Sequence, residues 1–164
     1  MPKVTTITPC LWFDGQAEEA ASFYTSIFPN SKIKQSARYD AEGARASGQP
    51  AGSVMTVVFE LDGQEFMGLN GGPQFPFSEA VSFIVNCETQ REIDHYWDKL
   101  TSTGGQEVQC GWLKDQFGVS WQIVPTALGH LLQAKDPEKS RRVMGALLKM
   151  KKLDLEALKQ AAAA

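Results

Sequence analysis

Apolar and polar residues follow a pattern that occurs twice along the chain. The adjacent aromatics Phe23 and Tyr24 are followed three positions later by an aliphatic residue, at the spacing of an amphipathic helix. The same arrangement returns at Tyr96 and Trp97, 73 positions after the first pair. Each copy follows an apolar, strand-like run and precedes further strand-like segments. The pattern predicts a duplicated unit of one strand, one helix and three strands.

The first half predicts a strand, a helix, an exposed edge strand, a polar loop and a hairpin. These segments cover, in that order, residues 4–13, 17–28, 32–39, 40–53 and 54–70. Asp62-Gly63 separates two strand-like runs within the last range, which favours a tight hairpin turn. The glycine-containing loop is long enough to act as a mobile lid.

The second half predicts the same order of elements and then a tail without a counterpart. Strands are expected at 80–87, 108–114 and 119–124, and a helix at 91–102. In the tail, Pro137 suits the first position of a helix, and Asp154 suits the cap of a last one. We therefore expect a single domain over 1–164, built from the following parts: a first unit at 1–73, a second at 77–125 and a helical tail at 126–164.

The composition and charge of the chain argue against nucleic-acid and membrane partners. The 164 residues are 43% hydrophobic and 21% charged, as in an ordinary globular protein, and the net charge is −3. Such a balance provides no basic field for nucleic acid. No apolar run is long enough to cross a membrane, and the N-terminus lacks the apolar core of a signal peptide. We expect a cytoplasmic protein with neither a nucleic-acid nor a membrane partner.

Three cysteines stand at Cys10, Cys87 and Cys110. Their number is odd and no pair has the CxxC spacing of a zinc or redox motif. In a reducing compartment they are expected to be small buried apolar residues.

Five strings of the chain are distinctive as a set: Thr8-Pro9-Cys10-Leu11-Trp12-Phe13-Asp14-Gly15, Phe23-Tyr24, Cys110-Gly111-Trp112-Leu113-Lys114-Asp115, Phe117-Gly118-Val119-Ser120-Trp121-Gln122-Ile123-Val124-Pro125, and Met150-Lys151-Lys152-Leu153-Asp154-Leu155 in the tail. Together they resemble the PhnB-like branch of the vicinal oxygen chelate superfamily. Members of that superfamily include glyoxalase I, bleomycin-resistance proteins, fosfomycin-resistance enzymes and extradiol dioxygenases. The resemblance implies an α+β fold of tandem βαβββ units that form a curved mixed-sheet cup, with a C-terminal helical extension. It also implies pairing of units within or across chains, and we expect a homodimer.

The superfamily's chemistry depends on a divalent metal held by strand residues. Aligning the two copies places the corresponding positions at Pro9 (within one residue), Met67, Ser82 and Gln122. Proline has no ligand atom, methionine is a soft thioether, and serine and glutamine offer neutral oxygens, whereas such metals favour carboxylate or imidazole. We expect no metal and no cofactor. These four residues, with Asn70 before Gly71-Gly72, are instead the candidates for lining a ligand pocket.

Other chemical motifs are weak. His95 and His130 fall in predicted helices, away from the strand positions. Asp115-Gln116-Phe117-Gly118 resembles a kinase magnesium motif without its spacing or its phosphate loop, so turn chemistry is expected there.

Four functions remain open from the sequence. The first is binding of a small molecule of unknown identity in the inter-unit cleft without metal, as bleomycin-resistance proteins do. The second is a glyoxalase-like or thiol-transferring lyase, isomerase or transferase with a degenerate metal site, or with Asp40 and Glu42 as acid–base groups. The third follows the label of 3-demethylubiquinone-9 3-methyltransferase given to this branch, although no glycine-rich loop marks a methyl-donor site. The last is a structural dimer with a vestigial cleft.

Overall fold

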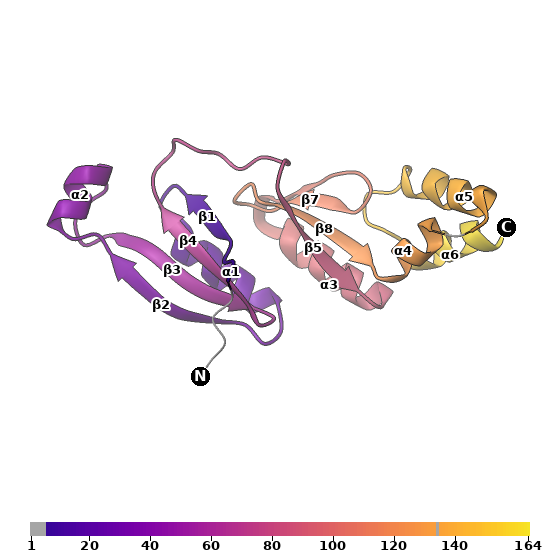
Figure 1. Ribbon diagram of the computed structural model, residues 1–164, viewed down its shortest axis with the longest axis horizontal. Helices are drawn as coiled ribbons and strands as arrows, with labels where there is room; N and C mark the ends of the chain where they lie inside the picture. The colour runs from indigo at the N-terminus through magenta and orange to yellow at the C-terminus, as the bar shows by residue number, and fades with distance from the viewer. Residues whose placement is uncertain (1–5, 134) are drawn as a thin grey trace. The chain divides into compact units, whose positions relative to one another are not determined.

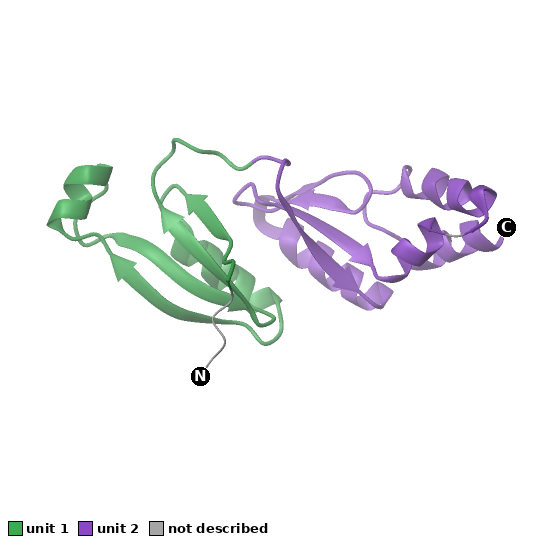
Figure 2. Ribbon diagram, viewed as in Figure 1, with its two compact units in different colours: residues 1–77 green, residues 78–164 purple. Residues whose placement is uncertain are grey.

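The computed structural model describes residues 6–133 and 135–164 of the chain. It contains two compact units, residues 1–77 and residues 78–164 (Figure 2). Within the described ranges, no helix is long and apolar enough to cross a membrane.

Unit 1 is a four-stranded mixed sheet with a helix packed on one face (Figure 1). The strand order is β1-β4-β3-β2; β1 runs parallel to β4, and the other neighbours are antiparallel. Helix α1 packs against β3 and β4. The elements are β1 (Cys10–Phe13), α1 (Ala17–Ile27), β2 (Lys32–Arg38), α2 (Ala41–Ser47), β3 (Val54–Leu61) and β4 (Gln64–Asn70).

Unit 2 repeats this plan and adds three helices. Its strand order is β5-β8-β7-β6, with β5 parallel to β8, and helix α3 packs against β8 and β7. The elements are β5 (Ser82–Cys87), α3 (Gln90–Thr101), the short 3₁₀ helix η1 (Ser102–Gly104), β6 (Gln106–Glu107), β7 (Trp112–Lys114), β8 (Ser120–Pro125), α4 (Ala127–Leu132), α5 (Pro137–Leu147) and α6 (Leu155–Ala163).

The two sheets confirm the predicted α+β fold of tandem βαβββ units. In each unit the first strand pairs with the fourth, and the third and second complete the sheet. The repeated aromatic pair places one core residue in each unit, because Tyr24 is fully buried and Trp97 is 1% exposed. Burial of such large rings against the sheet accounts for the duplication of the aromatic pattern.

The hairpin of unit 1 forms as predicted. Asp62 and Gly63 both have positive φ, 47° and 81°, which the tightest hairpin turns require at their two central positions. Strand β2 lies at the edge of the sheet and is exposed along its whole length, in agreement with its prediction as an edge strand.

The prediction of a loop over 40–53 is wrong for half of that range. Residues 41–47 form α2, whose first turn is capped by the carboxylate of Asp40, which accepts a hydrogen bond from the Gly43 amide at 2.7 Å. Gly48 ends the helix in the left-handed conformation. The following residues are held by Tyr39, whose backbone pairs with Gly52 and Ser53. A folded, capped helix thus occupies half of the predicted loop.

Two predicted strands are shorter than expected. The first begins at Cys10 instead of residue 4; Val4 and Thr5 of that prediction lie outside the described residues. The strand predicted at 108–114 is reduced to β7, because Cys110 and Gly111 have positive φ of 61° and 83° and turn the chain. Their amides donate to the carbonyls of Met150 and Lys151 in the tail, so a contact distant in sequence decides this break.

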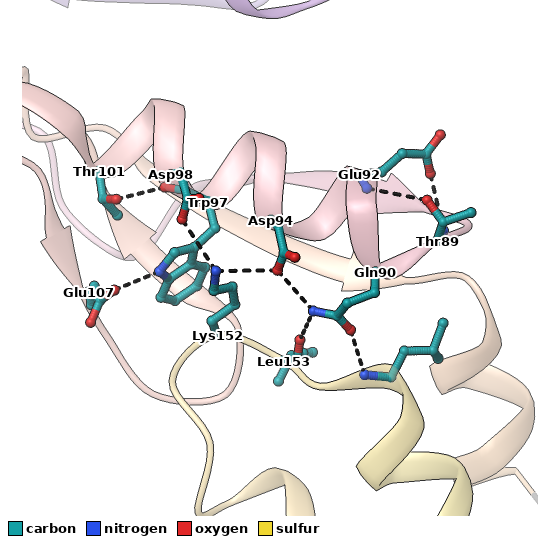
Figure 3. A network of polar contacts seen from close by, with 11 residues as sticks. Thr89, Gln90, Glu92, Asp94, Trp97, Asp98, Thr101, Glu107, Lys152 and Leu153 are labelled. Atoms are coloured by element: carbon teal, nitrogen blue, oxygen red, sulfur yellow. Dashed lines mark hydrogen bonds and ion pairs between the residues drawn. The ribbon is translucent and has the colours of Figure 1, made fainter.

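The helical tail has a core of its own and is attached to α3. Buried side chains of α4, α5 and α6 pack around Leu153, which is fully buried. Figure 3 shows the attachment: the Gln90 amide donates to the Leu153 carbonyl at 3.0 Å and accepts from the Leu155 amide at 2.8 Å. Lys152 forms ion pairs with Asp94 and Asp98 on the same helix. The predicted start at Pro137 and the predicted cap at Asp154 are both confirmed.

Candidate functional site

Each sheet has one face covered by its helix and one opposite face, which we call the open face. In unit 2, successive side chains along each strand point alternately to the helix-covered face and to the open face. Leu113, Trp121 and Ile123 point toward α3 and are at most 3% exposed. The open face of unit 2 carries the intervening residues Ser82, Ile84, Asn86, Trp112, Lys114, Ser120, Gln122 and Val124.

Strand pairing arranges the open face of unit 2 in rows across β5, β8 and β7. The first row joins Ser82, Ser120 and Lys114, which are direct neighbours in the pairing register. The second row joins Ile84, Gln122 and Trp112 in the same way. Residues opposite one another on neighbouring strands lie about 4.5–5.5 Å apart, so each row forms a continuous strip of side chains.

The polar groups of these rows contact one another. Gln122 Nε2 donates a hydrogen bond to Ser82 Oγ at 2.9 Å. Ser120 is 1% exposed, and its Oγ has no hydrogen-bond partner among the described residues. An unpaired buried hydroxyl costs about 1–3 kcal/mol. The structure therefore brings together two of the predicted site residues, Ser82 and Gln122, and adds an unsatisfied hydroxyl between them and Lys114.

In unit 1 the second row corresponds to Cys10, Met67 and Val58, whereas Glu65 and Glu60 correspond to Ser120 and Lys114 of the first row. Met67 is the register partner of Cys10, just as Gln122 is the partner of Ile84 in unit 2. The Pro9 carbonyl accepts a hydrogen bond from the Met67 amide at 2.9 Å. By strand alternation, however, the Pro9 side chain is on the helix-facing side. The residue equivalent to Ser82 is Thr8, one position from the predicted Pro9.

An aromatic residue lies at the edge of the open face of unit 1. The indole Nε1 of Trp12 donates to the Gly72 carbonyl at 2.9 Å, and Phe75 packs on its ring edge-on with centroids 4.9 Å apart. A Cβ atom at Gly71 would lie 2.1 Å from the Trp12 ring, so a residue without a side chain is required there. The Gly71-Gly72 pair thus accommodates this tryptophan.

Asn70 makes hydrogen bonds within unit 1 through both of its side-chain polar groups and through its carbonyl. Its Oδ1 accepts from the Ala17 amide at 2.9 Å, at the start of α1, and its Nδ2 donates to the Val54 carbonyl at 3.1 Å. Its own carbonyl accepts from the Tyr39 hydroxyl at 2.6 Å. Asn70 also borders a hollow of about 360 Å³, lined by Gly15, Glu18, Gln49, Pro50, Ser53, Val54 and Asn70.

The donor set does not fit the divalent metal of the superfamily. Among the described residues, no three histidine, cysteine, aspartate or glutamate side chains come together in a group that could hold a metal ion. His95 and His130 lie exposed on α3 and α4, away from the strand positions. The open faces carry hydroxyl, amide, thioether and thiol groups, which are poor ligands for Mg²⁺ or Mn²⁺. They also carry two carboxylates, Glu60 and Glu65, and both form ion pairs with Lys34.

Lys114 and Trp112 lie on the open face of unit 2 beside Ser120 and Gln122, and the sequence interpretation did not select them as candidates. Their signal was present: Leu113 between them is apolar, so alternation alone puts both neighbours on the opposite face. Lys114 Nζ forms an ion pair with Glu79 at 2.5 Å, and that lysine holds the pKa of Glu79 below its usual value.

The three thiols differ in exposure. Cys87 is fully buried, Cys110 is half-buried, and Cys10 is exposed, so the expectation of three buried cysteines is wrong for Cys10. Burial, with a smaller effect of the Glu92 charge, raises the pKa of Cys87 to about 12.

We expect the folded protein to be alkylated by iodoacetamide at Cys10 and to be protected at Cys87 at pH 8, because only an accessible thiolate reacts. Peptide mass spectrometry after timed quenching measures both sites. Cys87 should react in urea, where the chain is unfolded. Equal rates at the two cysteines in the folded protein would contradict the assigned burial.

Comparison with known proteins identifies the family. The model of the family described as 3-demethylubiquinone-9 3-methyltransferase matches residues 5–124. The PhnB protein from Bacillus cereus is 39% identical over 74% of this chain and 100% of that chain, with a TM-score of 0.66. This chain belongs to the PhnB-like family. Among proteins with curated descriptions, none matches.

Two more distant structures share the fold of this PhnB-like protein. Protein PA1353 from Pseudomonas aeruginosa is 20% identical, covering 74% of this chain and 98% of its own, with a TM-score of 0.58. The fosfomycin-resistance protein FosX from Listeria monocytogenes is 15% identical, covering 82% of this chain and 100% of its own, with a TM-score of 0.53. These two likenesses show a shared fold, the tandem βαβββ arrangement described above. The helices α4–α6 lie beyond the part that the family model matches.

Proposed function

We propose that this PhnB-like protein binds a small organic molecule on the open face of the unit 2 sheet, without the divalent metal of the superfamily it resembles. The observation that supports this most directly is the polar pair Ser82–Gln122 beside the unpartnered hydroxyl of Ser120. A buried polar group without a partner is uncommon in proteins and favours a site that a ligand completes.

The acid–base and methyl-transfer alternatives have less support. The carboxylate of Asp40 caps α2, so it is engaged in holding the backbone. Each four-stranded sheet of the described residues has a single parallel pair, unlike the doubly wound parallel sheets that place a glycine-rich loop against a nucleotide-like cofactor. The family description supports a methyltransferase by name only.

Binding should depend on Gln122. In a fragment screen by native mass spectrometry, we expect Gln122→Leu to weaken the fragments that bind by about tenfold, the equivalent of one hydrogen bond to a partly buried group. Gln160→Leu, on the exposed surface of α6, is the matched control and should leave binding unchanged.

Elemental analysis of the purified protein provides a second check of the same proposal. Stoichiometric Mn, Fe or Zn that is lost in Ser82→Ala or Gln122→Leu would contradict a metal-free site. Absence of any fragment that distinguishes wild type from Gln122→Leu would favour the structural dimer with a vestigial cleft.

We also propose that a second copy of the chain completes the binding site as a homodimer. An exposed sheet face is only one wall of a pocket, and Ile84 on that of unit 2 is 56% exposed. Light scattering measures the oligomeric state directly, and a monomer at micromolar concentration would oppose this part of the proposal.

A further inference from the structure

We propose that the open face of unit 2 selects a planar aromatic anion, with its flat part on Trp112 and its carboxylate at the row of Ser82, Ser120 and Lys114. This inference rests on the proposed function and specifies its ligand class. It depends on three features of the face: its charge, the donors of one row and the position of an aromatic ring.

Charge comes first. Lys114 is the one charged residue among the eight that make up the open face of unit 2. Its side chain is 30% exposed, and its partner Glu79, in the segment before β5, is 59% exposed. A partly desolvated ammonium attracts an anion more strongly than one in bulk water. An entering carboxylate can therefore replace Glu79 at the Lys114 ammonium group.

The row that contains Lys114 offers further donors. Ser82 Oγ accepts the hydrogen bond of Gln122, which leaves its own proton to donate. Ser120 Oγ has no partner among the residues that the structure describes. Two hydroxyl donors and an ammonium group in one row suit the oxygens of a carboxylate, which only accepts hydrogen bonds.

An aromatic ring stands one row away on the same strand. Trp112 and Lys114 are two residues apart on β7, so their Cα atoms are separated by roughly 6–7 Å. Trp112 is half-buried, and Ile84 lies in its row beyond Gln122. A flat ring placed on the indole would direct a carboxylate substituent toward Lys114. Stacking on the Trp112 indole and contact with the apolar Ile84 side chain favour a planar ligand over a saturated one.

The test compares three probes on the full-length chain by isothermal titration calorimetry. Naphthalene carboxylate is planar and anionic, naphthalene carboxamide is planar and neutral, and decalin carboxylate is anionic and saturated. We expect the first to bind more tightly than either of the others. Lys114→Met should weaken naphthalene carboxylate by about tenfold or more, whereas Lys159→Met, an exposed lysine on α6, should not.

For the variant Glu79→Gln we expect tighter binding of naphthalene carboxylate, not weaker binding. Removing the competing carboxylate should tighten naphthalene carboxylate by about threefold to tenfold, and a folding defect cannot mimic that result. Equal affinities for wild type, Lys114→Met and Glu79→Gln would overturn the inference.

The outcomes separate this inference from the proposed function. Binding of the carboxamide alone, lost in Gln122→Leu and retained in Lys114→Met, would refute the anionic ligand and leave small-molecule binding in place. Failure of every probe and of every fragment to distinguish Gln122→Leu from wild type would refute both.

Discussion

Replacing Asp115 with leucine is expected to lower the free energy of unfolding of unit 2 by about 3–5 kcal/mol. The Asp115 carboxylate is 3% exposed and accepts three hydrogen bonds. Its Oδ1 accepts from the amides of Phe117 and Val119 at 2.9 and 3.1 Å, and its Oδ2 accepts from the indole of Trp121 at 2.8 Å. Leucine would leave these three donors buried without their acceptor.

The measurement is hydrogen exchange of the β8 amides together with urea unfolding. Asp115→Asn keeps one oxygen acceptor, so it should lower the free energy of unfolding by a smaller amount, about 1–2 kcal/mol. Asp98→Leu is the surface control: its side chain is 68% exposed and pairs with Lys152, so its effect should stay within about 1 kcal/mol. A loss for Asp115→Leu as small as that of Asp98→Leu would show that the carboxylate does not organise this turn.

Replacing Leu158 with alanine is expected to destabilise the helical tail by about 2–5 kcal/mol. Leu158 on α6 is fully buried and packs in the cluster formed with Val143, Leu147 and Leu153. Truncation removes apolar contact and leaves a cavity that neighbouring side chains fill only in part.

Leu148, directly after α5, is the matched control because it is the same residue type in the same tail but 60% exposed. Leu148→Ala should change stability by no more than about 0.5 kcal/mol. Hydrogen exchange of the amides of α5 and α6 reports the tail directly. Similar losses for the two alanine variants would contradict the assigned core.

Sequence patterns predicted those elements whose signals are local. The hairpin at 54–70 has its turn residues between two strand-like runs, and α5 begins at the predicted Pro137. Asp115 was expected to serve turn chemistry, and its three hydrogen bonds confirm this. Local propensity and capping chemistry determine such features without distant contacts.

Predictions failed where competing or distant interactions determined the backbone conformation. Gly43, Gly48 and Pro50 suggested a loop, yet the Asp40 cap and the left-handed Gly48 define a helix between them. The turn at Cys110 and Gly111 pairs with the tail some 40 residues later, which no local pattern indicates. Within the predicted range of one residue around Pro9, strand pairing selects Thr8 as the equivalent of Ser82, because a shift of one residue exchanges the two faces of a strand.

The sequence by itself determined the duplicated scaffold, since the repeated aromatic pair and the strand alternation follow from which residues must be buried. It also determined that the four aligned positions Pro9, Met67, Ser82 and Gln122 offer neither carboxylate nor imidazole, because that depends only on residue type. Tertiary structure alone decided which side chains meet. The neighbours Ser82, Ser120 and Lys114 come from three strands whose order is not sequential, and only the pairing register places two hydroxyl groups and one cation in a single row.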